Sequence, residues 1–258
     1  MANYDNGSAR YGTTTVDRTA AGIDEGLRAH MLRVYNYMVM GLALTGVFAL
    51  GTFSLAVTNT PTAYQVGQGM YLTSLGTAIF TSPLQWVIML APLGLVFFLS
   101  FRIQKMSVAA AQMTFWVFAA LLGISLSSIF VVYTATSITQ VFFIAAGTFG
   151  AMSLWGYTTK RDLTGMGSFL MMGLIGLIIA MVVNIFLQSS ALGFAVSAIG
   201  VLIFVGLTAY DTQKIKEMYY VNDDGTVAGR KAIMGALRLY LDFINIFLFM
   251  LQLFGNRN

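Results

Sequence analysis

The sequence has no cysteine and only one histidine, His30, among its 258 residues. Without cysteine, disulfide bonds, thiolate nucleophiles and cysteine-based metal sites are excluded. One histidine cannot build a zinc site by itself, and the sequence contains neither an HExxH motif nor a phosphate-binding glycine loop. The run GISLS at 123–127 lacks the last glycine of a GxSxG motif, and no histidine lies in the apolar runs to activate its serine. We therefore expect no enzymatic activity and no tightly bound cofactor.

Charge is also scarce. Only 9 % of the residues are charged, whereas an average soluble domain has about 25 %. Hydrophobic residues make up 57 % of the chain, and its mean hydropathy is +0.76. A water-soluble chain of this length could not cover its surface with so few charges, so we expect an all-α integral membrane protein. The net charge of +4 follows the membrane topology and does not predict a nucleic-acid partner.

Long apolar runs are abundant instead. A helix that crosses a bilayer needs about 20 predominantly apolar residues. The sequence predicts a bundle of seven transmembrane helices over residues 34–254, preceded by a polar segment, 1–33, and followed by a short tail, 255–258. The seven runs are Val34–Val57, Pro83–Phe101, Met113–Val132, Val141–Tyr157, Ser168–Leu187, Leu192–Tyr210 and Leu239–Phe254.

Basic residues alternate between the connections. They occur before the first run and after the second, fourth and sixth, and none lies in the connections after the first, third and fifth. Of the 14 basic residues, only Arg257 falls outside this alternation. Because cytoplasmic loops carry an excess of Lys and Arg, the pattern predicts a cytoplasmic N-terminus and supports the count of seven.

Three local features are more specific. Apolar and charged pairs at i,i+4 spacing within residues 16–33, Ile23 with Leu27 and Asp24 with Arg28, predict a short interfacial helix. Residues 60–80 carry no charge and are expected to form a long external loop. Small residues recur within three runs, where they allow helices to pack closely. These are Gly147, Gly150, Ala151, Gly173, Gly176, Gly200 and Gly206.

Two aspartates, Asp211 and Asp242, lie at the end of the sixth run and within the seventh. A charge in the hydrocarbon costs about 2.5–3.5 kcal/mol, so such residues face a cavity or a partner. If the last span begins at Arg238 and ends at Arg257, Asp242 lies about 6 Å inside the edge of the membrane, at the same depth as Asp211. A span beginning at Lys231 would place Asp242 about 16 Å deep and keep the two aspartates apart. We prefer the first boundary, which predicts a paired site.

An alternative is that each acid is neutralised within its own helix. Arg238 precedes Asp242 by four residues, and Lys214 follows Asp211 by three, which are spacings that allow contact on one helix. The other polar residues of the spans are expected to form hydrogen bonds between helices. They are Asn184, Asn245, Ser125, Ser127 and Ser128.

Residues 209–216, AYDTQKIK, and residues 239–255, LYLDFINIFLFMLQLFG, resemble the Bax inhibitor-1 family, the transmembrane Bax-inhibitor-motif proteins. SPLQWVIMLAPLGLVF at 82–97 and GTFGAMSLWGYTTKRDL at 147–163 resemble its bacterial branch. The resemblance implies a multi-pass inner-membrane protein in which six helices surround a central seventh. It also implies a pH-sensitive calcium leak controlled by two acids, which fall on Asp211 and Asp242. A basic residue ending the second helix latches the pair in some members.

For that latch, Arg102 is the candidate. We expect Arg238, Lys214 and Asn245 to surround the two aspartates. Two carboxylates in a partly desolvated site cannot both ionise at low cost, so a shared proton would tie the sixth helix to the seventh. Loss of that proton would loosen the contact and open a path beside the seventh helix. Calcium would bind there only transiently while it permeates, because two carboxylates are too few for a closed site.

Two other functions remain open. The polar 33-residue N-terminal segment could engage a membrane-bound ATP-dependent quality-control protease, with the chain as its regulator or substrate. A proton-coupled transporter would need a substrate pocket, and the sequence indicates none. The expected partners are therefore the lipid bilayer and calcium ions, with the protease as the alternative.

Overall fold

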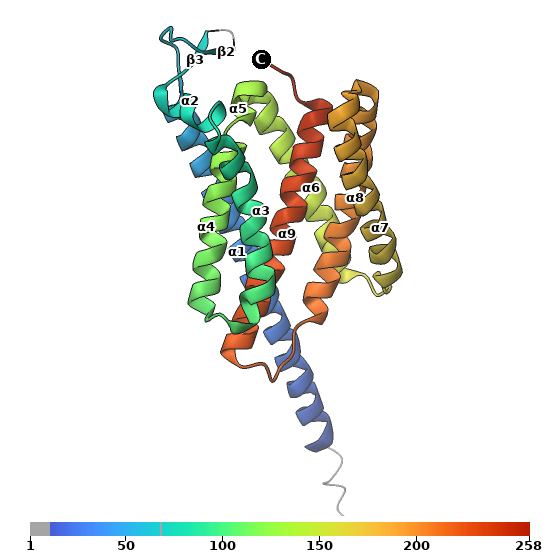
Figure 1. Cartoon of the computed structure of the whole chain (residues 1–258). Helices are drawn as coiled ribbons and strands as arrows, with labels where there is room; N and C mark the ends of the chain where they lie inside the picture. Colours follow the sequence, from blue (N-terminus) through green and yellow to red (C-terminus); the bar gives the residue numbers. More distant parts are fainter. Residues whose placement is uncertain (1–10, 68) are drawn as a thin grey trace, which may run out of the picture.

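A computed structural model describes residues 11–258 apart from residue 68, with side chains described from Glu25 onward. Seven of its helices are long and apolar enough to cross a membrane, and each predicted run lies on one of them. The chain is thus an all-α membrane protein, as predicted (Figure 1). The seven are α1 (Tyr11–Ala56), α3 (Leu84–Arg102), α4 (Val108–Leu126), α6 (Ala135–Thr158), α7 (Thr164–Leu187), α8 (Ser190–Glu217) and α9 (Gly225–Phe254).

The first helix is one continuous element. The separate short helix expected within residues 16–33 does not occur, because α1 runs without a break from Tyr11 to Ala56. It projects beyond the bundle at the end where α8 finishes and α9 begins (Figure 1). The side chains of Ile23 and Asp24 lie outside the described residues, as do residues 1–10. An interfacial position for the first turns of α1 stays a prediction.

The connection expected as a long external loop contains regular structure that the sequence did not predict, and its external location stays a prediction. Strands β1 (Val57–Thr58), β2 (Gln65–Gly67) and β3 (Met70–Leu72) form an antiparallel sheet in the order β1-β3-β2. Helix α2 (Ser74–Phe80) follows, and the Thr73 side chain caps it by accepting a hydrogen bond from the Gly76 N–H. Strand pairing and capping satisfy backbone groups that an irregular loop at a membrane surface would leave to solvent.

The C-terminal tail is fastened to the same end of the molecule. Asn258 N–H donates to the carbonyl of Val132, the last residue of the short helix α5 (Ile129–Val132), at 3.0 Å. Thr134 N–H donates to Asn256 O, also at 3.0 Å. Residues 256–258 therefore close over the connection between α5 and α6.

The last helix is by far the most buried span. In α9, 72 % of the most apolar stretch is buried, against 6–39 % in the other six. It packs against α1, α4, α6 and α8, whereas α3 packs mainly on α4, and α7 on α8. That all six other helices surround α9 stays a prediction.

The last helix is longer than the predicted span, and the position of the membrane edge along it stays a prediction. The helix begins at Gly225, 14 residues before the predicted Leu239, and Lys231 lies inside it. Thirty helical residues extend about 45 Å, longer than a hydrocarbon core of about 30 Å, so the helix can continue beyond the membrane. Asp211 and Asp242 nevertheless lie side by side, as described below, so an early helix start does not separate them.

Small residues contribute less to helix packing than the sequence predicted. A side chain added at Gly147, Gly150 or Gly176 would meet open space. By contrast, Gly200 faces the Phe249 ring of α9, and Gly206 faces Leu170 of α7. The repeat of small residues did not reveal which of them face a neighbouring helix, because the spacing alone does not fix the rotation of a helix.

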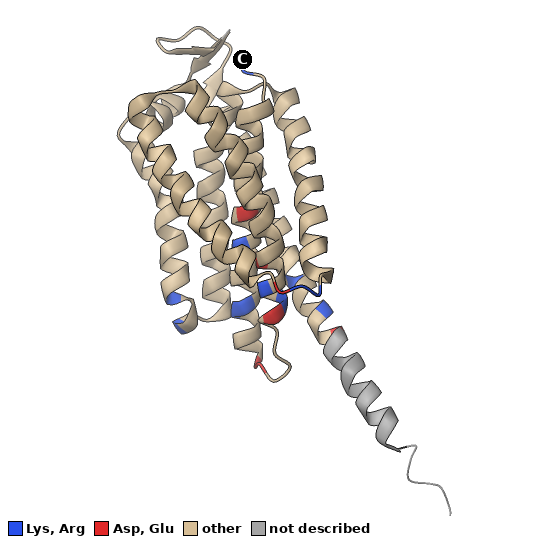
Figure 2. Ribbon diagram, turned by 90° about the vertical axis from the view of Figure 1, so that its right-hand side faces the viewer, with Lys and Arg blue, Asp and Glu red and all other residues tan. Residues whose placement is uncertain are grey.

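Among the residues whose side chains are described, the basic ones gather in one half of the bundle, the half from which α1 projects, apart from Arg257 near the C-terminus (Figure 2). We call this the basic end. The observed gathering agrees with the alternation in the sequence, and the cytoplasmic location of the basic end stays a prediction.

Candidate functional site

Asp211 and Asp242 come from two helices that pack against each other. Asp211 lies on α8, six residues before that helix ends at Glu217, and Asp242 lies on α9. Asp242 is 4 % exposed and is the one acidic residue among the buried side chains of the described residues. An acid in this position must be neutral or paired, because burial of an isolated charge is too costly.

The two carboxyl groups lie within hydrogen-bonding reach of each other. Asp242 Oδ2 is buried, and no N–H or hydroxyl of the described residues donates to it. Ionised carboxylates only accept hydrogen bonds, so these two can bond to each other only when a proton lies between them. The geometry therefore suits a pair that holds one proton at the contact between α8 and α9.

Arg238 lies beside this pair and bridges the same two helices. Its Nη1 is 3.8 Å from Asp211 Oδ1, and its side chain is 45 % exposed. Four residues separate Arg238 from Asp242 on α9, so both side chains project from the face that meets α8. The cation is thus placed to compensate the negative charge of the pair while part of it remains in solvent.

Neutralisation within each helix, the alternative from the sequence, is not what the structure shows. Lys214 Nζ forms an ion pair with Glu217 at 2.7 Å instead of Asp211. Arg238 reaches across to Asp211 on the neighbouring helix. Of the three residues expected around the pair, Arg238 is therefore the one that contacts it through an ion pair.

The remaining polar predictions meet mixed outcomes. Asn245 Nδ2 donates to Leu241 O of its own helix at 2.8 Å. Ser127 and Ser128 also donate to carbonyls of their own segment, and Asn184 accepts from the nearby Ser189 N–H. The prediction of hydrogen bonds between helices was wrong for Asn245, Ser127 and Ser128, because short polar side chains reach local backbone groups first. Asn184 on α7, by contrast, bonds to the N-cap residue of α8.

Arg102, the latch candidate, is exposed at the end of α3. No ion pair joins it to either aspartate among the described residues. The basic side chain next to the pair in this structure is Arg238. A latching role for Arg102 in another state stays a prediction.

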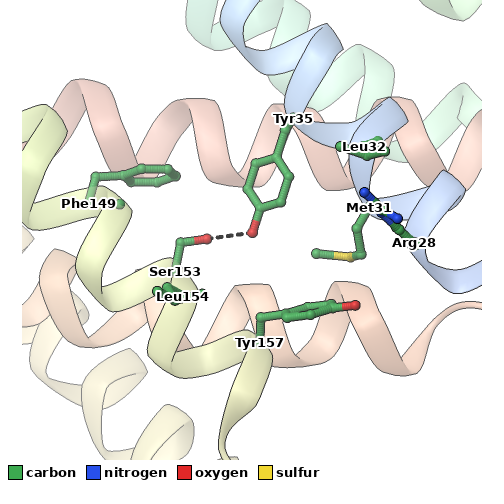
Figure 3. Close-up of a pocket in the computed structure, with 9 residues that line it drawn as sticks. Arg28, Met31, Leu32, Tyr35, Phe149, Ser153, Leu154 and Tyr157 are labelled. Carbon is green, nitrogen blue, oxygen red and sulfur yellow. Dashed lines mark hydrogen bonds between the residues drawn. The ribbon is translucent and has the colours of Figure 1, made fainter. Parts of the chain in front are cut away.

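A chain of hydroxyl groups that links α1, α6 and α8 was missed in the sequence. Tyr35 on α1 is hydrogen bonded to Ser153 on α6 at 2.7 Å, and Ser153 to Thr212 on α8 at 2.9 Å. Thr212, the neighbour of Asp211, donates onward to Thr208 O. Figure 3 shows Tyr35 and Ser153 meeting in a cavity of about 620 Å³ between α1 and α6. Hydroxyls in spans are common, so only the fold identifies these three as one chain.

His30 is also placed differently from the sequence-based interpretation. We expected it outside the bundle, but it is buried, 7 % exposed, with its ring centroid 5.9 Å from that of Tyr219. Its Nε2 has no hydrogen-bond partner among the described residues. Helix α1 begins before the first apolar run and therefore contains His30. Hydropathy alone does not reveal this extension of the helix.

The site offers two carboxyl groups to a cation. Among the described residues, no three His, Cys, Asp or Glu side chains gather in a way that could hold a metal ion. Carboxylate oxygens are the ligands that Ca²⁺ prefers, and two of them suit brief contact better than a closed site with six to eight ligands.

Known proteins resemble this chain along nearly its whole length. The family model "Inhibitor of apoptosis-promoting Bax1" matches residues 27–258. RP147 of Rickettsia prowazekii is 49 % identical over 245 residues, covering 95 % of both chains. "Inner membrane protein YbhL" of Escherichia coli K12 is 47 % identical, covering 90 % of this chain and 93 % of its own. "Uncharacterized membrane protein SpyM3_0260" of Streptococcus pyogenes is 35 % identical, with coverage of 91 % and 96 %.

These matches agree with the seven helices and with the motifs around the two aspartates. They also support the predicted location, a multi-pass protein of the inner membrane. The chain belongs to the Bax inhibitor family.

Proposed function

We propose that this protein is a pH-sensitive calcium leak whose conducting state is controlled by the Asp211–Asp242 pair. One observation carries the proposal: two carboxyl groups on packed helices lie within hydrogen-bonding reach, and one of them is buried without another donor. Such a pair makes the contact between α8 and α9 depend on a single proton.

With the proton in place, the carboxyls are bonded and α8 is tied to α9. When the proton leaves, two negative charges face each other in a poorly solvated site, and the contact becomes repulsive. Arg238 moderates this repulsion only in part, because it stands 3.8 Å from Asp211 and its side chain is 45 % exposed to solvent. Separation of the helices would expose four carboxylate oxygens, to which permeating Ca²⁺ can bind and then leave.

Calcium flux into dye-loaded proteoliposomes tests this proposal. For the wild type, flux should rise as the pH increases from about 5.5 to about 8.5, because the shared proton is lost in that direction. Asp211→Asn and Asp242→Asn each remove one carboxyl group, so two negative charges cannot face each other at any pH, and each variant should give a low flux that does not respond to pH.

Asp162→Asn is the matched control, because Asp162 is an exposed acid outside the spans. It should keep the wild-type response. If both aspartate variants of the pair kept it too, the proposal would fail. Deleting residues 2–25 separates the leak from protease coupling, since the leak should persist and engagement through the N-terminal segment should not.

A further inference from the structure

A second cavity, of about 490 Å³, opens at the basic end between α3, the end of α8 and the first half of α9. Three of its nine lining residues are cations, Arg230, Lys231 and Arg238, and none is acidic. All three cations belong to α9, where spacings of one, seven and eight residues bring them toward the same cavity. The cavity is therefore lined by positive charge from a single helix.

Arg230 is held in a fixed position. Its Nε donates to Met106 O and its Nη1 to Gln104 O, both at 2.7 Å. No acidic side chain of the described residues forms an ion pair with it. A guanidinium has five N–H donors, so three remain after these two bonds. Arg230 thus presents a positive charge with unused donors, already oriented by the backbone.

The other two cations are shared with acids. Lys231 forms an ion pair with Asp223 in the connection between α8 and α9. Arg238 has the longer contact to Asp211, with Asp242 behind it. From the end of α8, Glu217 is already paired with Lys214. The acids near this cavity therefore leave the positive charge of Arg230 without an ion pair, and Asp211 holds Arg238 only through a long contact.

Membrane topology explains why basic residues occur at this end, but it does not require them to converge. Arg102 and Lys105 lie at the same end, are exposed, and do not line the cavity. The positive-inside rule is satisfied equally by such scattered residues. Three cations that line one cavity, with one guanidinium anchored by backbone carbonyls, form an arrangement that suits an anion.

We propose that this cavity binds a phosphate-bearing anion, either free phosphate or the headgroup of an anionic phospholipid. Arg230 would be its anchor, and Arg238 would be shared between the anion and Asp211. Guanidinium groups recognise phosphate oxygens through paired charge-assisted hydrogen bonds. The volume accommodates a phosphate group with part of its ester.

Binding and the aspartate pair are then linked through Arg238. An anion that draws Arg238 away from Asp211 favours the form of the pair that carries the proton, because that form needs the cation less. By reciprocity, removing the charge of Asp211 should strengthen anion binding. This link rests on the proposed function, whereas the binding itself does not.

Binding is measured on the full chain in two arms. In the first, the chain in phosphatidylcholine nanodiscs is titrated calorimetrically with inorganic phosphate at constant ionic strength, with chloride as the reference anion. In the second, its thermal stability is compared in nanodiscs with and without phosphatidylglycerol. Neither arm measures calcium flux, so failure of the leak proposal leaves both interpretable.

Four variants locate the site. Arg230→Gln should weaken binding by about tenfold or more, the usual scale for losing a charged hydrogen-bonding partner. Ser100→Trp should also weaken it by filling the cavity, and it keeps every cation and breaks no hydrogen bond among the described residues. Lys105→Gln removes a charge that is exposed and lies outside the cavity, so this variant should bind like the wild type. Asp211→Asn should bind several times more tightly, by about threefold or more, if Arg238 is shared.

Binding in the first arm alone indicates a soluble anion, and an effect in the second alone indicates a lipid headgroup. Either result supports the site when Arg230→Gln and Ser100→Trp lose binding and Lys105→Gln keeps it. No binding in both arms overturns the proposal, and so does an equal loss of binding in Arg230→Gln and Lys105→Gln. Unchanged affinity in Asp211→Asn overturns only the link to the pair.

Discussion

Helices α7 and α9 are both long and apolar enough to cross a bilayer, yet they occupy opposite environments. Helix α7 is the most apolar of the seven spans, and 6 % of its most apolar stretch is buried. Helix α9 is among the least apolar, carries three cations and an aspartate, and is 72 % buried by the same measure. In a soluble protein the more apolar helix would be expected inside.

The reversal follows from the solvent. Lipid tails are as apolar as leucine, so an apolar side chain gains little by leaving the membrane for the protein interior. Polar groups gain more, because inside the bundle they find partners that lipid cannot provide. Asp242 illustrates this, since Asp211 and Arg238 are available only at the contact with α8.

The largest expected difference between the two helices comes from a matched truncation. Ile246 on α9 is fully buried, whereas Ile185 on α7 is 69 % exposed. Ile246→Ala should lower the free energy of unfolding by about 2–4 kcal/mol, because it leaves a cavity among packed helices. Ile185→Ala should change it by less than about 0.5 kcal/mol. Reversible unfolding in mixed micelles measures both, and equal losses would contradict the assignment of α9 as interior and α7 as lipid-facing.

A matched enlargement should have the next largest effect. A side chain at Gly235 of α9 would begin 3.0 Å from Ile215 and 3.3 Å from Val34, whereas one at Gly176 of α7 meets open space. Gly235→Leu should destabilise by about 1–3 kcal/mol through overpacking. Gly176→Leu should be neutral or slightly stabilising, since leucine favours a helix more than glycine does. The same unfolding measurement applies, and a tolerated Gly235→Leu would show that α9 is loosely packed.

The smallest expected effect concerns the acid before α7. The Thr164 hydroxyl and N–H donate to Asp162, and these bonds hold the pKa of Asp162 below its ordinary value. Its contribution to stability is therefore present above the unfolded pKa and lost as the pH falls through the lower folded value, below about pH 4.

In Asp162→Asn, the loss of stability that Asp162 causes at low pH should disappear. The melting temperature at neutral pH should stay within about 1 °C of the wild type. Melting curves between about pH 3 and about pH 6 measure it. A large effect at neutral pH would mean that this exposed acid, like the buried Asp242, holds tertiary structure.

Much of the fold could be predicted from residue types alone. A run of about 20 apolar residues is typical of a membrane-crossing helix, so hydropathy located all seven helices. The AYDTQKIK and LYLDFINIF motifs pointed to the correct family. The same motifs singled out Asp211 and Asp242 because acids are rare in spans. That they are neighbours also followed from a depth argument, although the helix that carries Asp242 begins well before the span used in that argument.

Other features depended on side-chain direction and on contacts between distant segments. Hydropathy could not reveal that α9 is the buried helix, because lipid and the protein interior are similarly apolar and hydropathy does not distinguish them. Nor could spacing reveal that Arg238 turns to Asp211, that Lys214 turns to Glu217, or that Tyr35 reaches Ser153. The sequence by itself determined how many helices cross the membrane and which acids lie in them. Only the tertiary structure decided which partners those acids have, because helix rotation and packing are set by all the neighbouring helices together.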